Sequence, residues 1–519
     1  MAVSRRARFR PRGVVLDRPP QFVPDEFWTA CSNATFRHDV VERSGGYKSV
    51  WQDTNAFPTP PIQGAYAPFQ GTGYWVMVGT DTVFSTDGAT HTDITPTAGL
   101  VAVSYNDWVI DNLNGLAVFT NGVDTPFWWN GNPQFQCEPL PDFPAPGART
   151  VRAYKNHLVA MNMTGVNNDD QVLFWSDAAA AGTIPQSWTP GELSDAGDNV
   201  LGDEIGPIID GRTLRDDFII YKRKATYIMT FVGGLVVMQF RKLFTEVGAL
   251  NKNCIAEVGG FHYVLTDGDV IRHDGQNLES IADDVIRQTL FRFITPENFQ
   301  TAYVQANAQE DEVWFFIPTQ FGDDPTIPTI AAVYHIDGGF WSVRGVPTIT
   351  GAASGIVTLD TTPADPTTWD DIVGSWQAQT EEWNAGSSTL GTVTDGMIWF
   401  GNGKAYFLDA SVDGDGTTIT ARLDRDSSSL GSPQSVKLVT KLWPDIRAVQ
   451  GTEFKFRVSG QVELYDNPIG SEATFIVGQD KWVDCLVSGK YISVEISTNQ
   501  DRLWEIVGYD LEYQEMSAY

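Results

Sequence analysis

The amino-acid sequence predicts an all-β protein with three parts: an extended N-terminal arm, a β-propeller of about six to seven irregular blades, and a C-terminal antiparallel β-sandwich or barrel. Two observations carry this prediction. A unit of short apolar strands joined by Asn-Gly or Asp-Gly turns recurs along most of the chain. The 17 Trp, 48 Gly and 28 Pro favour many short strands and turns over long helices. At 519 residues the chain is also too long for one ordinary core.

The first segment, residues 1–60, is rich in proline and has no hydrophobic periodicity, which predicts an extended docking arm with little core of its own. Its first 20 residues carry a net charge of +5, since they hold six Arg and one Asp. A basic arm of this kind binds DNA or an acidic neighbouring subunit, or it remains a solvated tail. The candidate partner contacts in the arm are Arg5, Arg6, Arg8, Arg10 and Arg12.

Residues 61–410 form the predicted propeller. Apolar strand pairs begin near seven positions: Gly73, Asn106, Lys155, Arg215, Gly259, Glu310 and Asp395. Two-residue turns supply the positive φ angles that type I′ hairpins need, at Asn114-Gly115, Asn121-Gly122, Asp267-Gly268, Asp274-Gly275 and Asn402-Gly403. Small sheets that are apolar on both faces are not stable singly. They bury one another when they are arranged radially, as in a propeller.

One segment of the predicted propeller has helical spacing. In Ser280–Phe293 the apolar residues follow a helical period, and Ser280 with Asp283 resembles a capping box. We expect one amphipathic helix between blades, packed on the propeller.

Residues 351–394 are a predicted insertion rich in Gly, Thr and Pro. Inside it Trp369, Trp376 and Trp383 recur every seven residues, a spacing that suits one face of a helix or an extended strip. The three indoles either close a flap over the protein's own surface or anchor in a neighbouring subunit. We take them as further candidate partner contacts.

The hydrophobic pattern changes in residues 411–519. From Thr417 onward, segments such as 453–458 and 490–496 alternate apolar and polar residues. Alternation of this kind is typical of half-buried antiparallel strands, so the segment predicts a separate β-sandwich or barrel domain.

Catalytic and metal-binding motifs have little support in this sequence. The six His form no HExxH or HxH pattern, and no nucleophile elbow or phosphate-binding loop occurs. The four Cys are scattered without a CxxC pair, which predicts buried free thiols rather than a disulfide framework or a zinc site. We therefore expect no enzyme activity, no cofactor and no metal.

Two loops resemble known motifs but favour plain turns. Ser85-Thr86-Asp87-Gly88 is similar to the Asp-box of sialidase blades, although the closing Trp is missing. Asp413-Gly414-Asp415-Gly416 begins like a calcium loop, but its twelfth position is Asp424 instead of Glu. Both segments are interpreted as turns between strands.

The charge and hydropathy of the sequence argue against a nucleic-acid-binding protein and against a membrane-spanning or secreted one. The net charge of −30 argues against nucleic-acid binding over a broad surface. No apolar run approaches the roughly 20 residues that span a bilayer, and the N-terminus lacks the apolar stretch of a signal peptide. We expect a protein made and assembled in a cytoplasm.

Several stretches resemble the tail nozzle or tail hub (tail tubular) proteins of short-tailed bacteriophages. The opening, Gly13–Tyr47, is similar to the start of that family, with Asn33, Phe36, Arg37, Arg43, Gly46 and Tyr47 at the positions of its pattern. Leu173–Asp177, followed by Ser187–Pro190, resembles a short sequence motif that recurs in the propeller blades of this family. Residues 368–376 and the C-terminal segment 504–513 also resemble sequences of this family. The chain lacks the basic C-terminal ending that is common in the family.

The resemblance implies a non-enzymatic virion protein, assembled in the host cytoplasm. In that family a homo-oligomeric ring, six subunits in the expected case, extends the portal and adaptor channel and conducts genomic DNA during ejection. The implied partners are further copies of the chain, the head-to-tail connector proteins, and tail fibre or needle proteins. DNA passes through without sequence-specific binding. The alternative is a propeller-type tail protein that binds or hydrolyses glycans.

Overall fold

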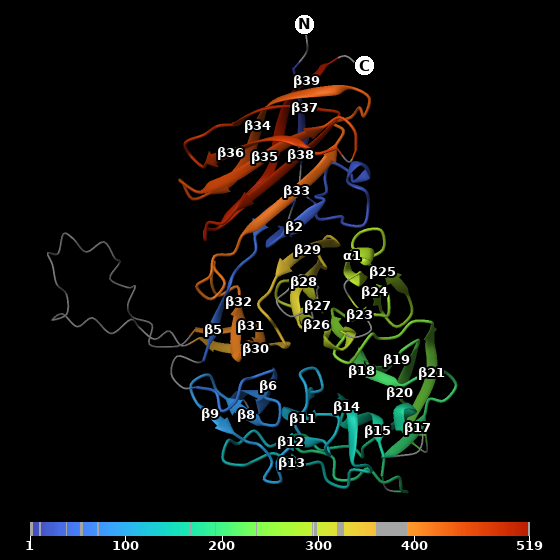
Figure 1. Cartoon of the computed structure of the whole chain (residues 1–519). Helices are drawn as coiled ribbons and strands as arrows, with labels where there is room; N and C mark the ends of the chain where they lie inside the picture. The colour runs from blue at the N-terminus through green and yellow to red at the C-terminus, as the bar shows by residue number, and fades with distance from the viewer. Residues whose placement is uncertain are drawn as a thin grey trace, which may run out of the picture.

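In the computed structural model, seven four-stranded sheets form a ring, and a two-layered β-sandwich sits on the rim of that ring (Figure 1). The structure describes residues 4–9, 12–37, 39–51, 56–69, 72–165, 169–192, 194–234, 236–292, 294, 298–318, 326–359, 392–464 and 466–516. The ring confirms the predicted propeller, with seven blades in this part of the chain.

The seven blades follow one another along the chain, and all their pairings are antiparallel. In blades 1 to 6 the first strand lies nearest the axis and the fourth at the rim (Figure 1). The strands of these six blades are β6 (Gln63–Phe69), β7 (Thr72–Val78), β8 (Val83–Thr86) and β9 (His91–Asp93); β10 (Val109–Leu113), β11 (Leu116–Thr120), β12 (Phe127–Trp129) and β13 (Glu138–Pro139); β14 (Gly147–Tyr154), β15 (His157–Thr164), β16 (Val172–Trp175) and β17 (Gly197–Val200); β18 (Ile208–Leu214), β19 (Asp217–Lys222), β20 (Ala225–Phe231) and β21 (Met238–Thr245); β22 (Ile255–Val258), β23 (Phe261–Leu265), β24 (Val270–His273) and β25 (Leu278–Ser280); β26 (Tyr303–Asn307), β27 (Glu312–Pro318), β28 (Pro328–His335) and β29 (Phe340–Gly345).

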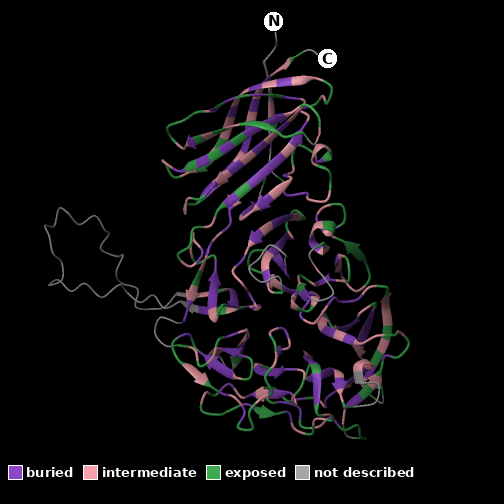
Figure 2. Cartoon of the chain, in the orientation of Figure 1, coloured by how far each residue is buried: buried purple, intermediate pink, exposed green. Residues whose placement is uncertain are grey.

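Hydrophobic side chains fill the spaces between consecutive blades, with one cluster for each neighbouring pair. Between blades 6 and 7, for example, the indoles of Trp314 and Trp399 lie 5.5 Å apart at an edge-to-face angle of 61°. Middle strands such as β11 and β27 are buried along their whole length (Figure 2). The blades therefore bury one another, which is the physical reason for the radial arrangement.

The hairpin turns follow the predicted chemistry at two of the five sites. Asn114-Gly115 has φ angles of 54° and 89°, and Asn402-Gly403 has 51° and 73°, so both residues of each pair are left-handed as a type I′ turn requires. At Asn121-Gly122, Asp267-Gly268 and Asp274-Gly275 only the glycine has a positive φ. These three turns are therefore of another type.

The seventh blade is completed by a strand from the N-terminal part of the chain. Its strands are β30 (Gly351–Leu359), β31 (Thr392–Gly401), β32 (Lys404–Leu408) and β5 (Tyr47–Val50). In the register Tyr47 pairs with Leu408 and Val50 with Ala405. Chain segments from opposite ends of the propeller thus close the ring through backbone hydrogen bonds.

The sandwich consists of two antiparallel sheets that enclose one core. The first sheet has the order β3 (Ala34–Arg37), β4 (Val40–Arg43), β39 (Trp504–Met516), β34 (Val436–Ala448) and β37 (Val483–Gly489), and β1 (Ser4–Phe9) also pairs with β39. The second sheet has the order β2 (Ala30–Ser32), β33 (Ala421–Ser428), β38 (Tyr491–Thr498), β35 (Glu453–Gln461) and β36 (Ile469–Ile476). Buried and more exposed residues alternate over 453–458 of β35 and along β38, as the sequence predicted.

The sandwich and the propeller share a continuous hydrophobic core. One cluster includes Phe456 of the sandwich, Trp341 of blade 6 and Leu265 of blade 5. The buried guanidinium of Arg43 donates hydrogen bonds to the carbonyl oxygens of Val412 (2.8 Å) and Ile419 (3.2 Å), on the segment that leaves the propeller. The same group contacts Asp501 of the sandwich at 2.8 Å. The two parts are therefore joined as one body.

The N-terminal segment is extended, as predicted, but it is not the separate docking arm that we expected for residues 1–60. It contributes β1 to β4 to the sandwich and β5 to the propeller. Phe9 is buried, and its ring stacks on Tyr509 at 4.7 Å. The segment folds onto the chain because it supplies missing partners to strand edges that otherwise lack them.

The helix predicted over Ser280–Phe293 is much shorter in the structure. Ser280 ends β25, and the helix α1 comprises only Arg287–Phe291. Asp284 has a φ of 58°, and this left-handed residue prevents a helix from running through it. The Ser280 hydroxyl still accepts a hydrogen bond from the Asp283 N–H at 3.2 Å, but this contact shapes a turn instead of a helix start. In the described part of the chain the other helical elements are the 3-10 turns η1 (Pro20–Phe22), η2 (Asp169–Gln171) and η3 (Phe299–Thr301).

The predicted insertion at 351–394 is smaller than expected, since both of its ends are strands of blade 7. Gly351 pairs with Phe400 and Leu359 with Thr392 in the β30–β31 register. Trp369, Trp376 and Trp383 lie outside the described residues. Their predicted role in partner contacts remains a prediction.

Two further expectations concern thiols and membranes. All four cysteines are free and buried, which confirms the predicted state of the thiols. Among the described residues no helix has the length and apolar character needed to cross a membrane.

Candidate functional site

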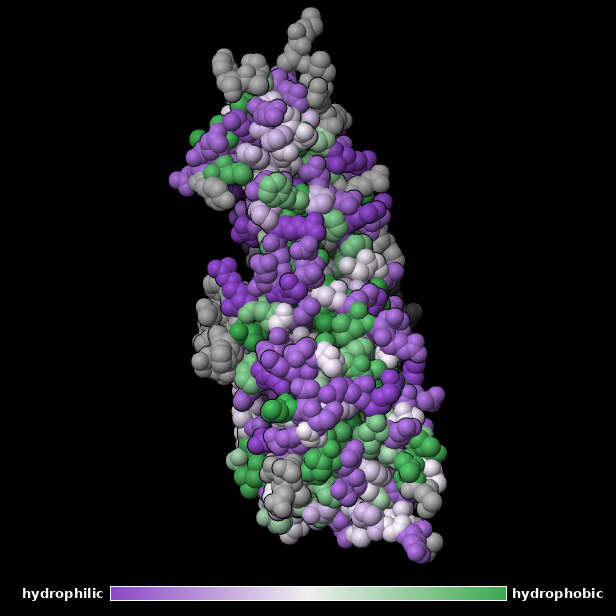
Figure 3. Space-filling model, turned by 90° about the vertical axis from the view of Figure 1, so that its right-hand side faces the viewer, coloured by the Kyte–Doolittle hydropathy of each residue, from purple (hydrophilic) through white to green (hydrophobic). Residues whose placement is uncertain are grey.

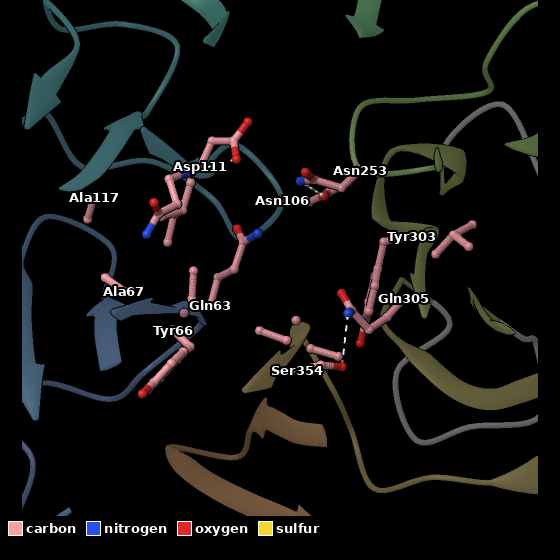
Figure 4. A pocket seen from close by; sticks show the side chains of 18 of the residues that line it. Gln63, Tyr66, Ala67, Asn106, Asp111, Ala117, Asn253, Tyr303, Gln305 and Ser354 are labelled. Carbon is pink, nitrogen blue, oxygen red and sulfur yellow. Dashed lines mark hydrogen bonds between the residues drawn. The ribbon is translucent and has the colours of Figure 1, made fainter. Parts of the chain in front are cut away.

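The innermost strands of the propeller surround a polar cavity of about 190 Å³ on the axis of the ring (Figure 4). Strands β6, β10, β14, β18, β26 and β30 all contribute to its wall, as does Asn253 just before β22. Every blade therefore supplies part of the lining. Its polar side chains are amides, tyrosines, hydroxyls, two arginines and one aspartate. This convergence makes the cavity the candidate functional site.

A buried ion pair stands beside the cavity and ties two blades together. Arg152 of β14 contacts Asp210 of β18 through Nε at 2.9 Å and Nη2 at 2.6 Å. Asp210 also accepts hydrogen bonds from the backbone N–H groups of Gly211 (2.8 Å) and Asn253 (3.0 Å). Burial raises the pKa of the Asp210 carboxyl, but the Arg152 charge and its hydrogen bonds outweigh burial and hold that pKa below the usual value.

An asparagine pair extends this network to two further blades. The side-chain amide of Asn253 donates hydrogen bonds to Asn106 Oδ1 (3.1 Å) and to the carbonyl oxygen of Trp108 (3.2 Å), while its own Oδ1 accepts one from Arg152 at 3.0 Å (Figure 4). The network thus connects blades 2, 3, 4 and 5 around the axis. It fixes the positions of the polar groups that face the cavity.

We predict that Asp210→Asn lowers the free energy of unfolding by about 3–5 kcal/mol, because the change leaves the Arg152 guanidinium buried without a counter-charge. A urea titration measures the loss. Asp445→Asn is a matched control, because Asp445 pairs with Arg8 at 3.1 Å while both side chains are about half exposed. That variant should lose less than about 1 kcal/mol. Equal small losses in both variants would contradict the role given to the axial pair.

A second arginine lines the cavity. Arg212 of β18 lies in its wall, and its guanidinium Nε has no hydrogen-bond partner among the described residues. Burial lowers the pKa of its guanidinium, and the nearby Arg152 charge lowers it further, against the opposing effect of Asp210 and Asp111. Arg212 is therefore a positive group that lies close to the axis because of its position on strand β18.

The cavity holds few groups for acid–base catalysis. Among the described lining residues Asp111 is the only carboxylate, and its Oδ2 accepts a hydrogen bond from the Ala153 N–H at 3.0 Å. Asp210 stands behind Arg152 and is engaged by it. Glycoside hydrolysis normally uses two carboxyl groups that flank the scissile bond.

The candidate partner contacts of the N-terminal segment lie far from this cavity, on the sandwich and its border. Arg8 pairs with Asp445, and Arg12 lies 3.8 Å from Glu26 and 3.7 Å from Asp39. Arg5 and Arg6 belong to β1 by their backbone, whereas Arg10 lies outside the described residues. Exposed pairs of this kind contribute little stability. Whether these arginines contact a partner remains a prediction.

The two motif-like loops are turns. In the Asp-box-like segment the Asp87 carboxylate accepts hydrogen bonds from the N–H groups of Ala89 (3.0 Å) and Thr90 (2.8 Å), which caps the β8–β9 hairpin. In the calcium-like loop Asp415 accepts from the Ser49 N–H (3.0 Å) and contacts Lys404 Nζ at 2.8 Å, so its carboxylate secures β5. No cluster of metal-ligating side chains occurs in the parts of the chain that the structure describes.

The axial residues carry a weak signal that motif searches do not detect. Arg152 lies between Val151 and Ala153, and Asp210 follows Ile208 and Ile209, so each is a charge next to apolar residues. Such charges are seldom buried unless they are paired. The sequence indicates that each needs a partner, but the choice of partner depends on the order of the blades.

Comparisons with known proteins find distant structural likeness only. No protein-family model matches the chain, and no curated protein matches it. PorZ, a surface component of the type-IX secretion system of Porphyromonas gingivalis, is 9% identical with a TM-score of 0.36 over 85% of this chain and 46% of its own. The Neurospora crassa Pan2 WD40 domain is 9% identical with a TM-score of 0.36 over 72% of this chain and 96% of its own. The GH74 xyloglucanase of Xanthomonas campestris is 8% identical with a TM-score of 0.35 over 66% of this chain and 56% of its own.

The chain spans about half the length of the first of these structures. Likeness at this distance carries no argument about function. The assignment of the propeller rests instead on the strand order and the seven inter-blade clusters.

Proposed function

We propose that this propeller protein is a non-enzymatic subunit of the tail nozzle, or tail hub, of a short-tailed bacteriophage. The observation that carries the proposal is that the N-terminal segment joins the two parts of the chain. It supplies strands β1 to β4 to the sandwich and strand β5 to blade 7 of the propeller. A shared hydrophobic core and the buried Arg43 connect the two parts. A rigid body of this kind suits a wall component of a particle. The sequence resemblance described above supports the same role.

In this proposal copies of the chain form a ring, six in the expected case, that extends the portal and adaptor channel. Tail fibre or needle proteins bind on the outside, and genomic DNA passes through the centre. Six subunits at −30 each would carry a formal charge of −180. Acidic groups facing the channel would repel DNA phosphates and let the genome slide without binding.

The surface of the chain offers places for subunit contacts. Hydrophobic patches alternate with hydrophilic surface over the propeller in Figure 3. Among exposed apolar side chains, Ile205 is 92% exposed in the connection between blades 3 and 4, and Ile469 is 81% exposed on the edge strand β36. Exposed apolar surface is characteristic of contact sites in assemblies.

Native mass spectrometry tests the proposed assembly. We expect the purified chain to form closed rings, alone or when it is mixed with connector rings of portal and adaptor from a short-tailed phage. The double variant Ile205→Ser/Ile469→Ser serves to map the contact: weakened rings place an interface there. Cys137→Ser changes a buried position and controls for general destabilisation. A chain that stays monomeric alone and with connector rings would contradict the nozzle proposal.

The rival function is glycan hydrolysis at the propeller axis. Among the described residues that line the cavity Asp111 is the single carboxylate, and Asp210 is paired with Arg152, which supports the non-enzymatic proposal. Release of reducing sugar from bacterial surface glycans, lost in Asp111→Asn, would favour the rival.

A further inference from the structure

Blade 4 ends in a long outer strand. β21 has eight residues, whereas the outer strands of blades 1, 2, 3, 5 and 7 have two to four. β21 lies at the rim of the ring in Figure 1, and among the strands of the described chain it pairs only with β20. Native proteins usually avoid long open edges, because a free row of N–H and C=O groups pairs readily with another strand.

Blade 6 has the next longest outer strand, and there the chain covers the edge itself. β29 has six residues, and the N-terminal segment runs beside it. The N–H of Val14 donates a hydrogen bond to the carbonyl oxygen of Trp341 at 3.3 Å, and the N–H of Asn33 donates one to that of Val343 at 3.0 Å. No described segment covers the edge of β21 in this way. The contrast indicates that a partner from outside the chain covers β21.

The open edge of β21 offers regularly spaced backbone groups to such a partner. At the β20–β21 turn the Val232 N–H donates to the Val237 carbonyl oxygen at 2.9 Å, so these two residues form a hydrogen-bonded pair. Hydrogen-bonded and non-hydrogen-bonded pairs alternate along an antiparallel ladder. In the β20–β21 register the non-hydrogen-bonded residues of β21, whose N–H and C=O groups point outward, are therefore Met238, Phe240 and Lys242.

The side chains along this edge are apolar and basic. At the turn Val232 is 56% exposed and Val236 is 61% exposed. Arg241 is exposed on the strand itself, whereas Lys242 is engaged by Asp203 at 2.9 Å. A two-fold pairing of β21 with its copy would bring the basic residues of the two strands together, and like charges across strands are destabilising. The edge therefore favours a different strand, one with acidic and large apolar side chains.

Residues 360–391 of the chain have this composition. They include six acidic residues, no Lys or Arg, and the three tryptophans Trp369, Trp376 and Trp383. The segment connects β30 and β31 of blade 7, which lies across the ring from β21 (Figure 1). Half of its 32 residues spans up to about 50 Å when extended, at about 3.3 Å per residue. That length is sufficient to reach a neighbouring copy.

We infer that the edge of β21 binds residues 360–391 of a second copy, which add to blade 4 as a further strand. Acidic side chains of the segment face Arg241, and its indoles cover Val232 and Val236. The contact joins blade 7 of one copy to blade 4 of the next, so it is head-to-tail and generates a ring when the rotation between copies closes. The inference rests on the proposed nozzle ring and names an interface within it.

Photo-cross-linking of the full chain tests this contact. The photoreactive residue p-benzoylphenylalanine takes the place of Trp369, Trp376 or Trp383, one position at a time. Isotope-labelled and unlabelled copies are mixed, so that mass spectrometry distinguishes links between copies from links within one chain. We expect links between copies that end in residues 232–245.

Two variants of β21 sharpen the test. Lys242→Pro removes an outward N–H that β20 does not use, so it should lower the cross-link yield about tenfold or more. Lys242→Gln is the matched control: it loses the same contact with Asp203 but keeps the N–H, and the yield should be unchanged. Arg241→Glu changes only an exposed side chain and should lower the yield several-fold through repulsion.

The outcomes separate this contact from the nozzle proposal. Rings with links to residues 232–245, lost in Lys242→Pro and kept in Lys242→Gln, support both. Rings whose links stay within one chain, reach another part of the second copy or do not form would overturn the contact and leave the nozzle proposal standing. Links to residues 232–245 in open filaments would support the contact and contradict the closed ring. A chain that stays monomeric alone and with connector rings would overturn both.

Discussion

A chain that lacks residues 1–51 is expected not to fold, although the deletion leaves six complete blades. Without β5, the edge of β32 in blade 7 has no partner from Leu408 to Ala405. Val50 and Trp51, which fill the space between blades 7 and 1, are lost with it. The sandwich loses four strands, β1 to β4, and the linking guanidinium of Arg43. Exposed strand edges and an open core favour aggregation over folding.

Circular dichroism and size-exclusion chromatography of the soluble fraction measure this effect. The control is a deletion of residues 1–10, which removes only the edge strand β1 and the stacked Phe9. That chain should keep a cooperative unfolding transition at a lower temperature. If the longer deletion yields a monomer with the parent's melting temperature, β5 does not close the ring in solution.

A second large effect is expected on acidification, and it arises from a buried cluster between blades 4 and 5. The Tyr221 hydroxyl lies 2.8 Å from His262 Nδ1 and 2.5 Å from His273 Nε2. His262 Nε2 contacts the Thr213 carbonyl oxygen at 2.9 Å, and His273 Nδ1 accepts a hydrogen bond from the Gly275 N–H at 3.2 Å. These contacts are all satisfied when both imidazoles are neutral, with a proton on Nε2 of each. An added proton has no acceptor.

The pKa values of both histidines are accordingly low. Burial lowers the pKa of His262 to about 3, with further lowering by the His273 and Arg212 charges against the Thr213 hydrogen bond. Burial also lowers the pKa of His273 to about 4, against the attraction of Asp274. In the unfolded chain both groups titrate near pH 6.5. Between pH 6.5 and about 4 the unfolded state thus binds more protons than the folded state, and stability falls as the pH falls.

The expected slope is steep. Each histidine contributes up to about 1.4 kcal/mol per pH unit, so the pair approaches about 2.7 kcal/mol per pH unit between pH 6 and 4. Urea titrations across this range measure it. The double variant His262→Gln/His273→Gln should be less stable at pH 7 but should lose this slope, because amides do not titrate. His91→Gln, near the surface, should keep the steep profile. Parallel profiles for the double variant and the parent chain would refute the explanation.

The local pattern of the sequence was sufficient to predict much of the propeller. Each of the seven predicted strand pairs falls in a different blade, because short apolar strands need no distant information to be recognised. Asn114-Gly115 and Asn402-Gly403 took the conformation that their residue types favour. The four thiols are buried as predicted, since nothing near them in sequence offers a metal or disulfide partner.

Other features were out of reach of local patterns. The helical period at 280–293 was overridden by the left-handed Asp284. The candidate contacts of the arm, such as Arg8, could be identified by charge, but their pairing with Asp445 in the sandwich could not. The axial cavity was also missed, because its polar residues come from all seven blades and form no motif along the chain.

The sequence by itself determined the strands, their turns, and the change in hydrophobic pattern at the boundary between propeller and sandwich. These features follow from hydrophobic periodicity and from the φ preferences of glycine, which act within a few residues. Only the tertiary structure decided that Tyr47–Val50 completes blade 7 and that Arg152 meets Asp210 beside the axis. These contacts join segments far apart in the chain. Their selection depends on the closure of the ring as a whole, since an open propeller leaves a strand edge and a buried charge without partners.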